Sequence, residues 1–166
     1  MNQIDSKQLR KTLGAMTTGV TVITTVGAEG THHGVTANSF TSVSLDPPLV
    51  LWSQAVTSRS HPVFRDSDRF IVNILAEDQS HISDRFAKSG DDKFVGLEIE
   101  PGLDGLPIIR GCAAYLECRK VAAYPGGDHI VFLGEVENIF RCDRIPLAFR
   151  DGKYLPRTAF AEMPIA

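Results

Sequence analysis

Alternation of side chains with a period of two dominates this chain and predicts many short strands. Every residue from 20 to 26 is β-branched, a composition typical of strands. Further strands are expected over residues 33–37, 40–44, 49–52, 70–75, 113–123 and 130–140. The segment 49–52 is continuously apolar, which predicts a strand covered on both faces.

Helical periodicity is confined to short segments. Leu9, Leu13 and Met16 repeat at helical spacing and share one face of a helix that Asp5 or Ser6 can cap. A turn leading into a second short helix is expected over residues 57–64. A third helix is predicted from residue 79 to about residue 88, with Asp78 as its N-cap.

The order of these elements indicates a mainly β fold with short helices. Residues 89–111 are turn-rich, and residues 147–155 predict a hairpin with Asp-Gly at its turn. The strands do not alternate with long helices, so a doubly wound α/β fold is disfavoured. Many short strands separated by turns favour a closed or nearly closed barrel. With no repeat, low-complexity tract or linker, the 166 residues are expected to form a single domain, 1–166.

Composition and charge narrow the class of partner. The chain is 43% hydrophobic and 22% charged, as in ordinary folded proteins, and its net charge of -3 argues against nucleic-acid and anionic membrane surfaces. No apolar run approaches the ~20 residues of a spanning helix. The first residues lack an apolar signal core, so a cytoplasmic location is expected.

Metal and thiolate chemistry are not indicated. The three cysteines form no CxxC pair, which predicts neither a disulfide framework nor a thiolate metal site. His32 and His33 are adjacent, and on a strand they would point to opposite faces. The GxGxxG, P-loop, HExxH and GxSxG motifs are also absent.

Four segments carry a chemical signal, although each also has an ordinary structural explanation. Residues 34–48 are dense in small hydroxyl and amide side chains, which let a flat ligand approach the backbone, or which simply form a polar barrel surface. In residues 53–62, the hydroxyl side chains and Arg59 could surround a phosphate. The alternative interpretation is that Ser58 or Ser60 simply caps the following helix. Residues 85–94 combine cationic and aromatic side chains. These could bind a phosphate, or they could form an ordinary solvent-exposed helix end. His129 follows a glycine turn, which places it at the rim of the barrel. It could contact a ligand there, or it could be an ordinary exposed histidine.

Together these segments resemble the flavin reductase family, the FMN-binding split barrels that act as reductase components of two-component monooxygenases. The resemblance covers about residues 8–155. It depends most on the stretch TANSFTSVSLDPP at residues 36–48, joined to the later GDH at residues 127–129. It implies a six-stranded barrel core, usually in a homodimer with flavin near the subunit interface.

The resemblance also implies roles for thirteen residues. Thr36, Ala37, Asn38 and Ser39 would line the isoalloxazine edge, largely through backbone groups; Ser53, Gln54, Ser58 and Ser60 would hold the ribityl chain and phosphate; Phe86, Ala87, Lys93 and Phe94 would close over the phosphate or the adenylate of FAD; and His129 would face the nicotinamide.

The implied reaction is hydride transfer from C4 of NADH or NADPH to N5 of FMN or FAD, without a metal and without an obligatory protein nucleophile. The reduced flavin would serve a partner flavin-dependent monooxygenase. The residues leave open a fixed-flavin oxidase on the same barrel, a non-enzymatic flavin- or haem-binding module and a plain structural subunit. They also leave open the choices between FMN and FAD and between NADH and NADPH.

Overall fold

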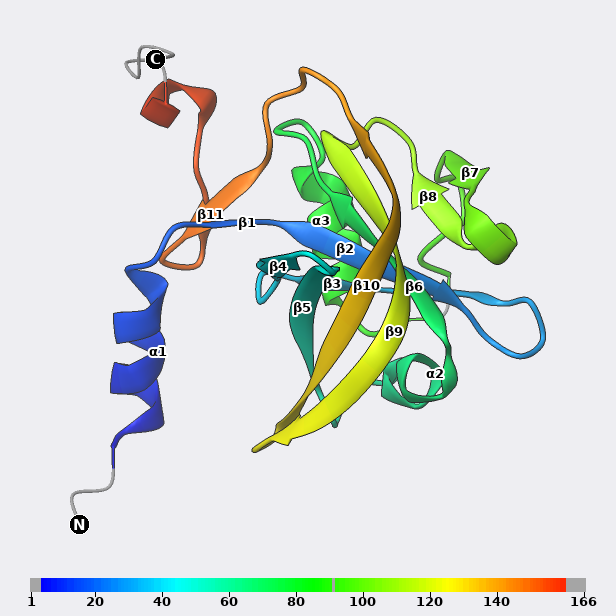
Figure 1. Ribbon diagram of the computed structural model, residues 1–166. Helices are drawn as coiled ribbons and strands as arrows, with labels where there is room; N and C mark the ends of the chain where they lie inside the picture. The colour runs from blue at the N-terminus through cyan, green and yellow to red at the C-terminus, as the bar shows by residue number, and fades with distance from the viewer. Residues whose placement is uncertain (1–3, 91, 161–166) are drawn as a thin grey trace.

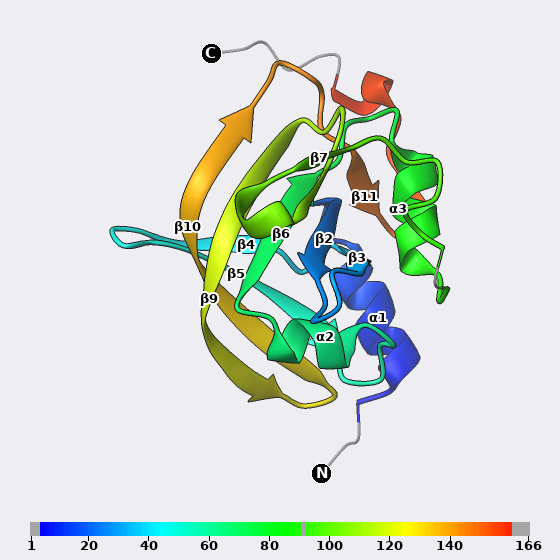
Figure 2. The same ribbon diagram turned by 90° about the vertical axis from the view of Figure 1, so that its right-hand side faces the viewer.

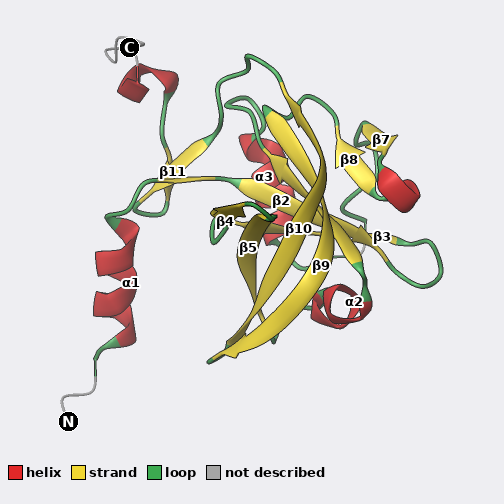
Figure 3. Ribbon diagram, viewed as in Figure 1, coloured by secondary structure: helices red, strands yellow, loops and turns green. Residues whose placement is uncertain are grey.

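The computed structural model describes residues 4–90 and 92–160 (Figures 1 and 3). Its elements in chain order are α1 (Ser6–Gly14), β1 (Thr18–Gly19), β2 (Thr21–Val26), β3 (His32–Ala37), β4 (Thr41–Leu45), β5 (Pro48–Ala55), α2 (His61–Asp66), β6 (Arg69–Ile74), α3 (Ser80–Ala87), β7 (Ile99–Pro101), η1 (Leu103–Gly105), β8 (Pro107–Ile109), β9 (Ala114–Gly126), β10 (His129–Arg141), β11 (Ala148–Arg150), β12 (Lys153–Tyr154) and η2 (Arg157–Phe160). The mainly β prediction with short helices is confirmed.

One antiparallel sheet of seven strands forms the body, in the order β3-β2-β6-β9-β10-β5-β4. It curves into a barrel in which the long β9–β10 pair crosses the front of Figure 1. Within the described residues, no strand pairs with the second edge of β3, so the sheet stays open between its two end strands, β3 and β4, and β3 lies near β5 without pairing with it. The hydroxyl of Ser39 bridges this split, because it lies 3.0 Å from both the backbone N and the backbone O of Ser53.

Aromatic packing fills the barrel interior. The ring of Trp52 on β5 meets Phe64 and Phe70 edge-on, at centroid distances of 5.1 and 5.9 Å, and lies 5.0 Å from Phe132. All four side chains are buried. Such pairs add to the apolar burial that stabilises the core. The interior side of β5 is therefore closely packed against the barrel core.

A second, three-stranded sheet joins the two ends of the chain, in the order β1-β11-β12. The Asp151-Gly152 turn of the predicted 147–155 hairpin lies between β11 and β12, and both turn residues have positive φ, as a two-residue hairpin turn requires. Backbone bonds from Val20 to Leu147 and from Leu147 to Leu75 tie this sheet to the barrel.

Helix α1 begins as predicted, with the Asp5 side chain accepting from the Lys7 N–H. Its predicted apolar face is not buried, however, because Leu9, Leu13 and Met16 are all exposed and the helix lies apart from the barrel (Figure 1). The periodicity therefore identified the helix correctly, but nothing in the described chain covers its apolar face.

Two local expectations were wrong, and a third was incomplete. The turn-rich segment 89–111 contains the β7–β8 pair, whose strands are only three residues long. Asp78 does not cap α3; Gln79 occupies the N-cap position, while Asp78 pairs with Arg144. Strand β5 is not covered on both faces: its burial alternates, with Val50, Trp52 and Gln54 inward and Leu51 only partly covered.

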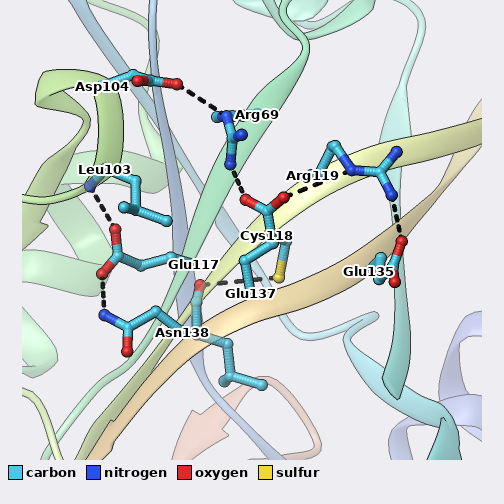
Figure 4. A network of polar contacts seen from close by, with 10 residues as sticks. Arg69, Leu103, Asp104, Glu117, Cys118, Arg119, Glu135, Glu137 and Asn138 are labelled. Atoms are coloured by element: carbon cyan, nitrogen blue, oxygen red, sulfur yellow. Dashed lines mark hydrogen bonds and ion pairs between the residues drawn. The ribbon is translucent and has the colours of Figure 1, made fainter. Parts of the chain in front are cut away.

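A polar network on the outer side of β6, β9 and β10 attaches the β7–β8 segment to the barrel (Figure 4). Arg69 pairs with Asp104 at 2.8 Å and also with Glu137. Glu117 is only 4% exposed, and its carboxylate accepts from the Leu103 N–H at 2.5 Å and from Asn138 Nδ2 at 2.7 Å. A buried carboxylate is tolerated here because both of its oxygens are hydrogen-bonded.

We expect Glu117→Gln to cost about 0.5–1 kcal/mol of folding free energy, because a neutral amide replaces a charged acceptor. The glutamine oxygen can still accept from Leu103 N–H, but its amide group then faces the Asn138 amide. Adding Asn138→Asp supplies an acceptor for that amide and is expected to recover most of the loss. Urea unfolding of the two variants and the wild type measures this; a double variant no more stable than Glu117→Gln would contradict it.

Candidate functional site

A cavity of about 870 Å³ opens at the split of the barrel, between β3, β5 and the segment that includes the end of α3. Its volume lies within the range of small-molecule sites. All thirteen residues singled out from the sequence line it: Thr36, Ala37, Asn38, Ser39, Ser53, Gln54, Ser58, Ser60, Phe86, Ala87, Lys93, Phe94 and His129. The fold thus brings together four segments that are separate in the sequence.

The β3 side of the cavity presents backbone more than side-chain groups. The Thr36 hydroxyl donates to the Ser83 carbonyl at 2.6 Å, and the Ser39 hydroxyl is committed to Ser53. The second edge of β3 has no partner strand among the described residues. Unpaired backbone N–H and C=O groups on a strand edge can read the hydrogen-bonding rim of a planar ring.

A cluster around the buried Gln54 shapes the opposite end. Gln54 Nε2 donates to Ser60 Oγ at 3.0 Å and to Ser58 Oγ at 3.3 Å, while His61 Nδ1 lies 3.2 Å from Gln54 Oε1. The two serine oxygens are 3.2 Å apart, so one hydroxyl can donate to the other. At least one serine O–H remains free to donate to a ligand oxygen. Gln54 therefore orients the hydroxyls through contacts inside the protein.

An aromatic group from α3 and the following loop covers the cavity. Phe86 meets Phe94 edge-on at 5.0 Å, and Phe94 meets His32 at 5.4 Å. A Cβ added at Gly34 would lie 2.5 Å from Phe86 Cε1, so the buried ring requires glycine beside it on β3. The close contact between Phe86 and Gly34 thus sets how near α3 lies to β3 at the cavity.

Lys93 links the two sides of this cover. Its Nζ donates to the carbonyl of Phe86 at 3.0 Å and to that of Gly34 at 3.3 Å, which leaves one of its three N–H groups. Burial lowers the pKa of the Lys93 ammonium. The side chain thus acts as a clip between α3 and β3 and retains one donor.

His129 lies at the rim, where β10 begins opposite Ala55 of β5. Its Nδ1 is 2.7 Å from the Asp128 carboxylate, and this hydrogen bond lowers the pKa of Asp128. A ring that donates through Nδ1–H and is neutral keeps a lone pair on Nε2. His129 can therefore accept a hydrogen bond from an amide group.

The charge of the lining is one-sided. Arg59, Lys88 and Lys93 contribute cations, and no aspartate or glutamate is among the described lining residues. Such a lining attracts an anion such as a phosphate. Lys88 and His32 also line the cavity, although no role was assigned to them from the sequence. Lys88 lies inside the segment 85–94 and His32 lies just before the segment 34–48, and neither position carried a distinguishing pattern.

Trp52 also lines the cavity, and its buried indole N–H has no hydrogen-bond partner among the described residues. The Trp52 ring itself packs in the aromatic core of the barrel. The small side chains and the cationic end of the lining fit a planar heteroaromatic ligand that carries a phosphate.

Two of the three cysteines are buried. Burial raises the pKa of the Cys112 and Cys118 thiols to about 12, so neither forms a thiolate at neutral pH. Across residues 4–90 and 92–160, no group of three or more histidine, cysteine or acidic side chains is arranged to hold a metal ion. The same residues contain no helix long and apolar enough to cross a membrane.

A split β-barrel with a cavity at its opening, lined by small polar side chains and cations, is typical of flavin-binding barrels. Comparison with known proteins makes this specific: residues 13–157 match the flavin reductase like domain. The chain belongs to this family.

Individual relatives and solved structures also come from flavin reductases. The FMN reductase (NADH) SmoA of Agrobacterium fabrum is 45% identical over 150 residues, covering 90% of this chain and 85% of the relative. HsaB of Mycobacterium tuberculosis, the reductase subunit of a flavin-dependent monooxygenase, is 41% identical, covering 92% and 82%. The structure of the NADH:FAD oxidoreductase SgcE6 of Streptomyces globisporus, in complex with NAD and FAD fragments, superposes with a TM-score of 0.86 at 38% identity, covering 94% and 96%.

Proposed function

We propose that the protein is an NADH-dependent flavin reductase that supplies reduced FMN or FAD to a partner monooxygenase. The observation that carries the proposal is the cavity at the barrel split, whose lining joins an unpaired strand edge, a hydroxyl cluster and three cations. Relatives with this reaction in their names match most of the chain. No cysteine nucleophile or protein-bound metal is needed, because the two cofactors carry the redox chemistry.

The residues divide by the part of the flavin that each would hold. The backbone of Thr36 to Ser39 borders the isoalloxazine edge, and backbone N–H donors there stabilise the negative charge that develops on the ring. Ser58, Ser60 and Arg59 hold the ribityl chain and the phosphate. Phe86 and Phe94 exclude water from the ring.

When bound, the flavin would supply the hydride acceptor, N5, and the nicotinamide would supply the hydride from C4. The chain's contribution to that step is orientation: His129 and the open side of the cavity keep the nicotinamide stacked on the ring. Holding two reactants in a reactive arrangement can lower a barrier by about 7–11 kcal/mol. Because the cavity opens at the barrel split, nicotinamide and flavin can enter and leave by the same side.

The proposal includes a homodimer in the cytoplasm. The exposed apolar side chains on the barrel strands include Leu45, Tyr124, Ile139 and Phe140, which supports a contact with a second copy of the chain. The three cysteines are free thiols, which suits a reducing compartment. Sedimentation equilibrium giving the mass of a monomer at micromolar concentration would remove the dimer from the proposal.

The reductase activity is tested by following NADH and NADPH oxidation at 340 nm with added FMN, FAD or no flavin. We expect turnover with NADH that saturates as free flavin is raised, and little oxidation without flavin. The four cofactor combinations also identify the preferred pair. A protein that retains flavin but does not turn over NADH would overturn the proposal and favour the fixed-flavin oxidase or the binding module.

A further inference from the structure

The C-terminal hairpin contacts the cover of the cavity at a single helix. Tyr154 on β12 places its phenol oxygen 2.9 Å from Ser83 Oγ and 2.6 Å from Asp84 Oδ1, both on α3. A carboxylate only accepts hydrogen bonds, so the phenol donates its hydrogen to Asp84. The Ser83 hydroxyl then donates its own hydrogen to the phenol oxygen. Burial, together with the Asp84 hydrogen bond, raises the pKa of Tyr154, so the phenol keeps its proton at neutral pH.

Ser83 continues this contact to the cavity. Its side chain is buried against the hairpin, while its carbonyl accepts the Thr36 hydroxyl at 2.6 Å. Thr36 lies on the cavity side of β3, 47 positions earlier in the chain. One residue of α3 thus joins the C-terminal hairpin to the strand edge proposed to border the flavin ring.

Helix α3 depends on such outside contacts. It has only eight residues, and no side chain caps its N-terminus. Helices this short gain their stability from tertiary packing. Its buried face carries Phe86, and Figure 2 shows the helix standing at the side of the barrel beside β3 and the C-terminal hairpin.

The hairpin itself is firmly held. The ring of Tyr154 packs edge-on against Phe149 at 5.6 Å, and both rings pack on the cluster that contains Phe86 and Ile82. Backbone bonds between Leu147, Val20 and Leu75 fix the start of the hairpin to the barrel. Tyr154 therefore links the hairpin to α3, whose buried residues Ile82 and Phe86 pack in the same cluster.

We propose that Tyr154 is a positioning residue for the flavin site, acting through Ser83 to set the distance between α3 and the β3 edge. This inference rests on the proposed assignment of the cavity to flavin. It predicts that loss of the phenol oxygen loosens flavin binding and leaves the reaction of bound flavin intact, because Tyr154 does not line the cavity.

The test is Tyr154→Phe, which keeps the ring and removes the hydroxyl. We expect the Kd for FMN, from quenching of flavin fluorescence, to rise about 3- to 5-fold, less than the full contribution of the charge-assisted bond to Asp84 because its loss reaches the flavin only indirectly. With saturating FMN and NADH, kcat should stay within about 1.5-fold of the wild type, a margin far below one hydrogen bond. Tyr115→Phe is the matched control, since Tyr115 is outside the cavity and stacks on Phe140.

A double variant tests the route through Ser83. Thr36→Val removes the other partner of the same residue, so the combined rise in Kd should be smaller than the product of the two single effects. An unchanged Kd in Tyr154→Phe overturns the inference, as does a fall in kcat and Tm without a change in Kd. Arg59→Ala serves as reference: if it weakens FMN binding and Tyr154→Phe does not, only the inference fails. If neither does, the flavin assignment of the cavity fails with it.

Discussion

Replacing Arg59 with alanine is expected to raise the KM for FMN by about 10- to 30-fold while leaving the KM for riboflavin nearly unchanged. Arg59 lines the cationic end of the cavity, and no hydrogen bond or ion pair holds it among the described residues. A charged hydrogen bond contributes about 1.5–3 kcal/mol, and the exposure of Arg59 places it toward the lower end of that range. Riboflavin lacks the phosphate, so it separates phosphate binding from ring binding.

Salt provides a second measurement of the same contact. Raising ionic strength should raise the KM for FMN in the wild type and change it less in Arg59→Ala, because screening weakens an exposed ion pair. Arg65→Ala is the matched control: Arg65 is exposed, pairs with Asp66 at 2.7 Å and does not line the cavity. Equal losses for FMN and riboflavin in Arg59→Ala would show that Arg59 does not bind the phosphate.

Local sequence patterns predicted the barrel strands well because their side chains are β-branched or alternate. The predicted segments 20–26 and 33–37 correspond closely to β2 and β3, and 70–75 to β6. The β7–β8 pair escaped because its three-residue strands include Pro101 and Pro107, and proline is a turn signal in any reading of sequence alone. Short strands of this kind exist through their tertiary contacts.

The candidate site could be assembled from the sequence only through the family resemblance. Each of its segments had a plain structural explanation, and what unites them is contact between distant positions. The Ser39 bridge to Ser53 spans 14 positions, and the link from Tyr154 to Ser83 spans 71. No periodicity encodes such pairs, because they depend on how the sheet curves and where it stays open.

Two side chains expected to contact the flavin make most of their hydrogen bonds inside the protein, and such contacts cannot be read from the sequence. Gln54 was expected to hold the ribityl chain and phosphate, and Lys93 to close over the phosphate. In the fold, Gln54 orients Ser58 and Ser60, and Lys93 spends two of its donors on backbone carbonyls of β3 and α3. Both remain in the cavity lining, so their effect on a ligand is partly indirect.

Replacing His129 with alanine is expected to raise the KM for NADH by about 3- to 10-fold, the loss of one hydrogen bond, with kcat within about twofold of the wild type. His129 lies at the open rim, and its Nδ1 is occupied by Asp128 at 2.7 Å. The remaining nitrogen can accept from the nicotinamide carboxamide, a contact made equally in the ground state and in the transition state. Such a contact changes KM and leaves kcat alone.

Two further variants separate this binding role from proton transfer. His129→Gln keeps an acceptor on a side chain of similar reach, so its KM for NADH should lie between those of the wild type and His129→Ala. His81→Ala is the matched control, because His81 is exposed on α3 and does not line the cavity. A collapse of kcat with an unchanged KM in both His129 variants would mean that the histidine moves a proton in the reaction. The retained activity of His129→Gln is thus the result on which the positioning role depends.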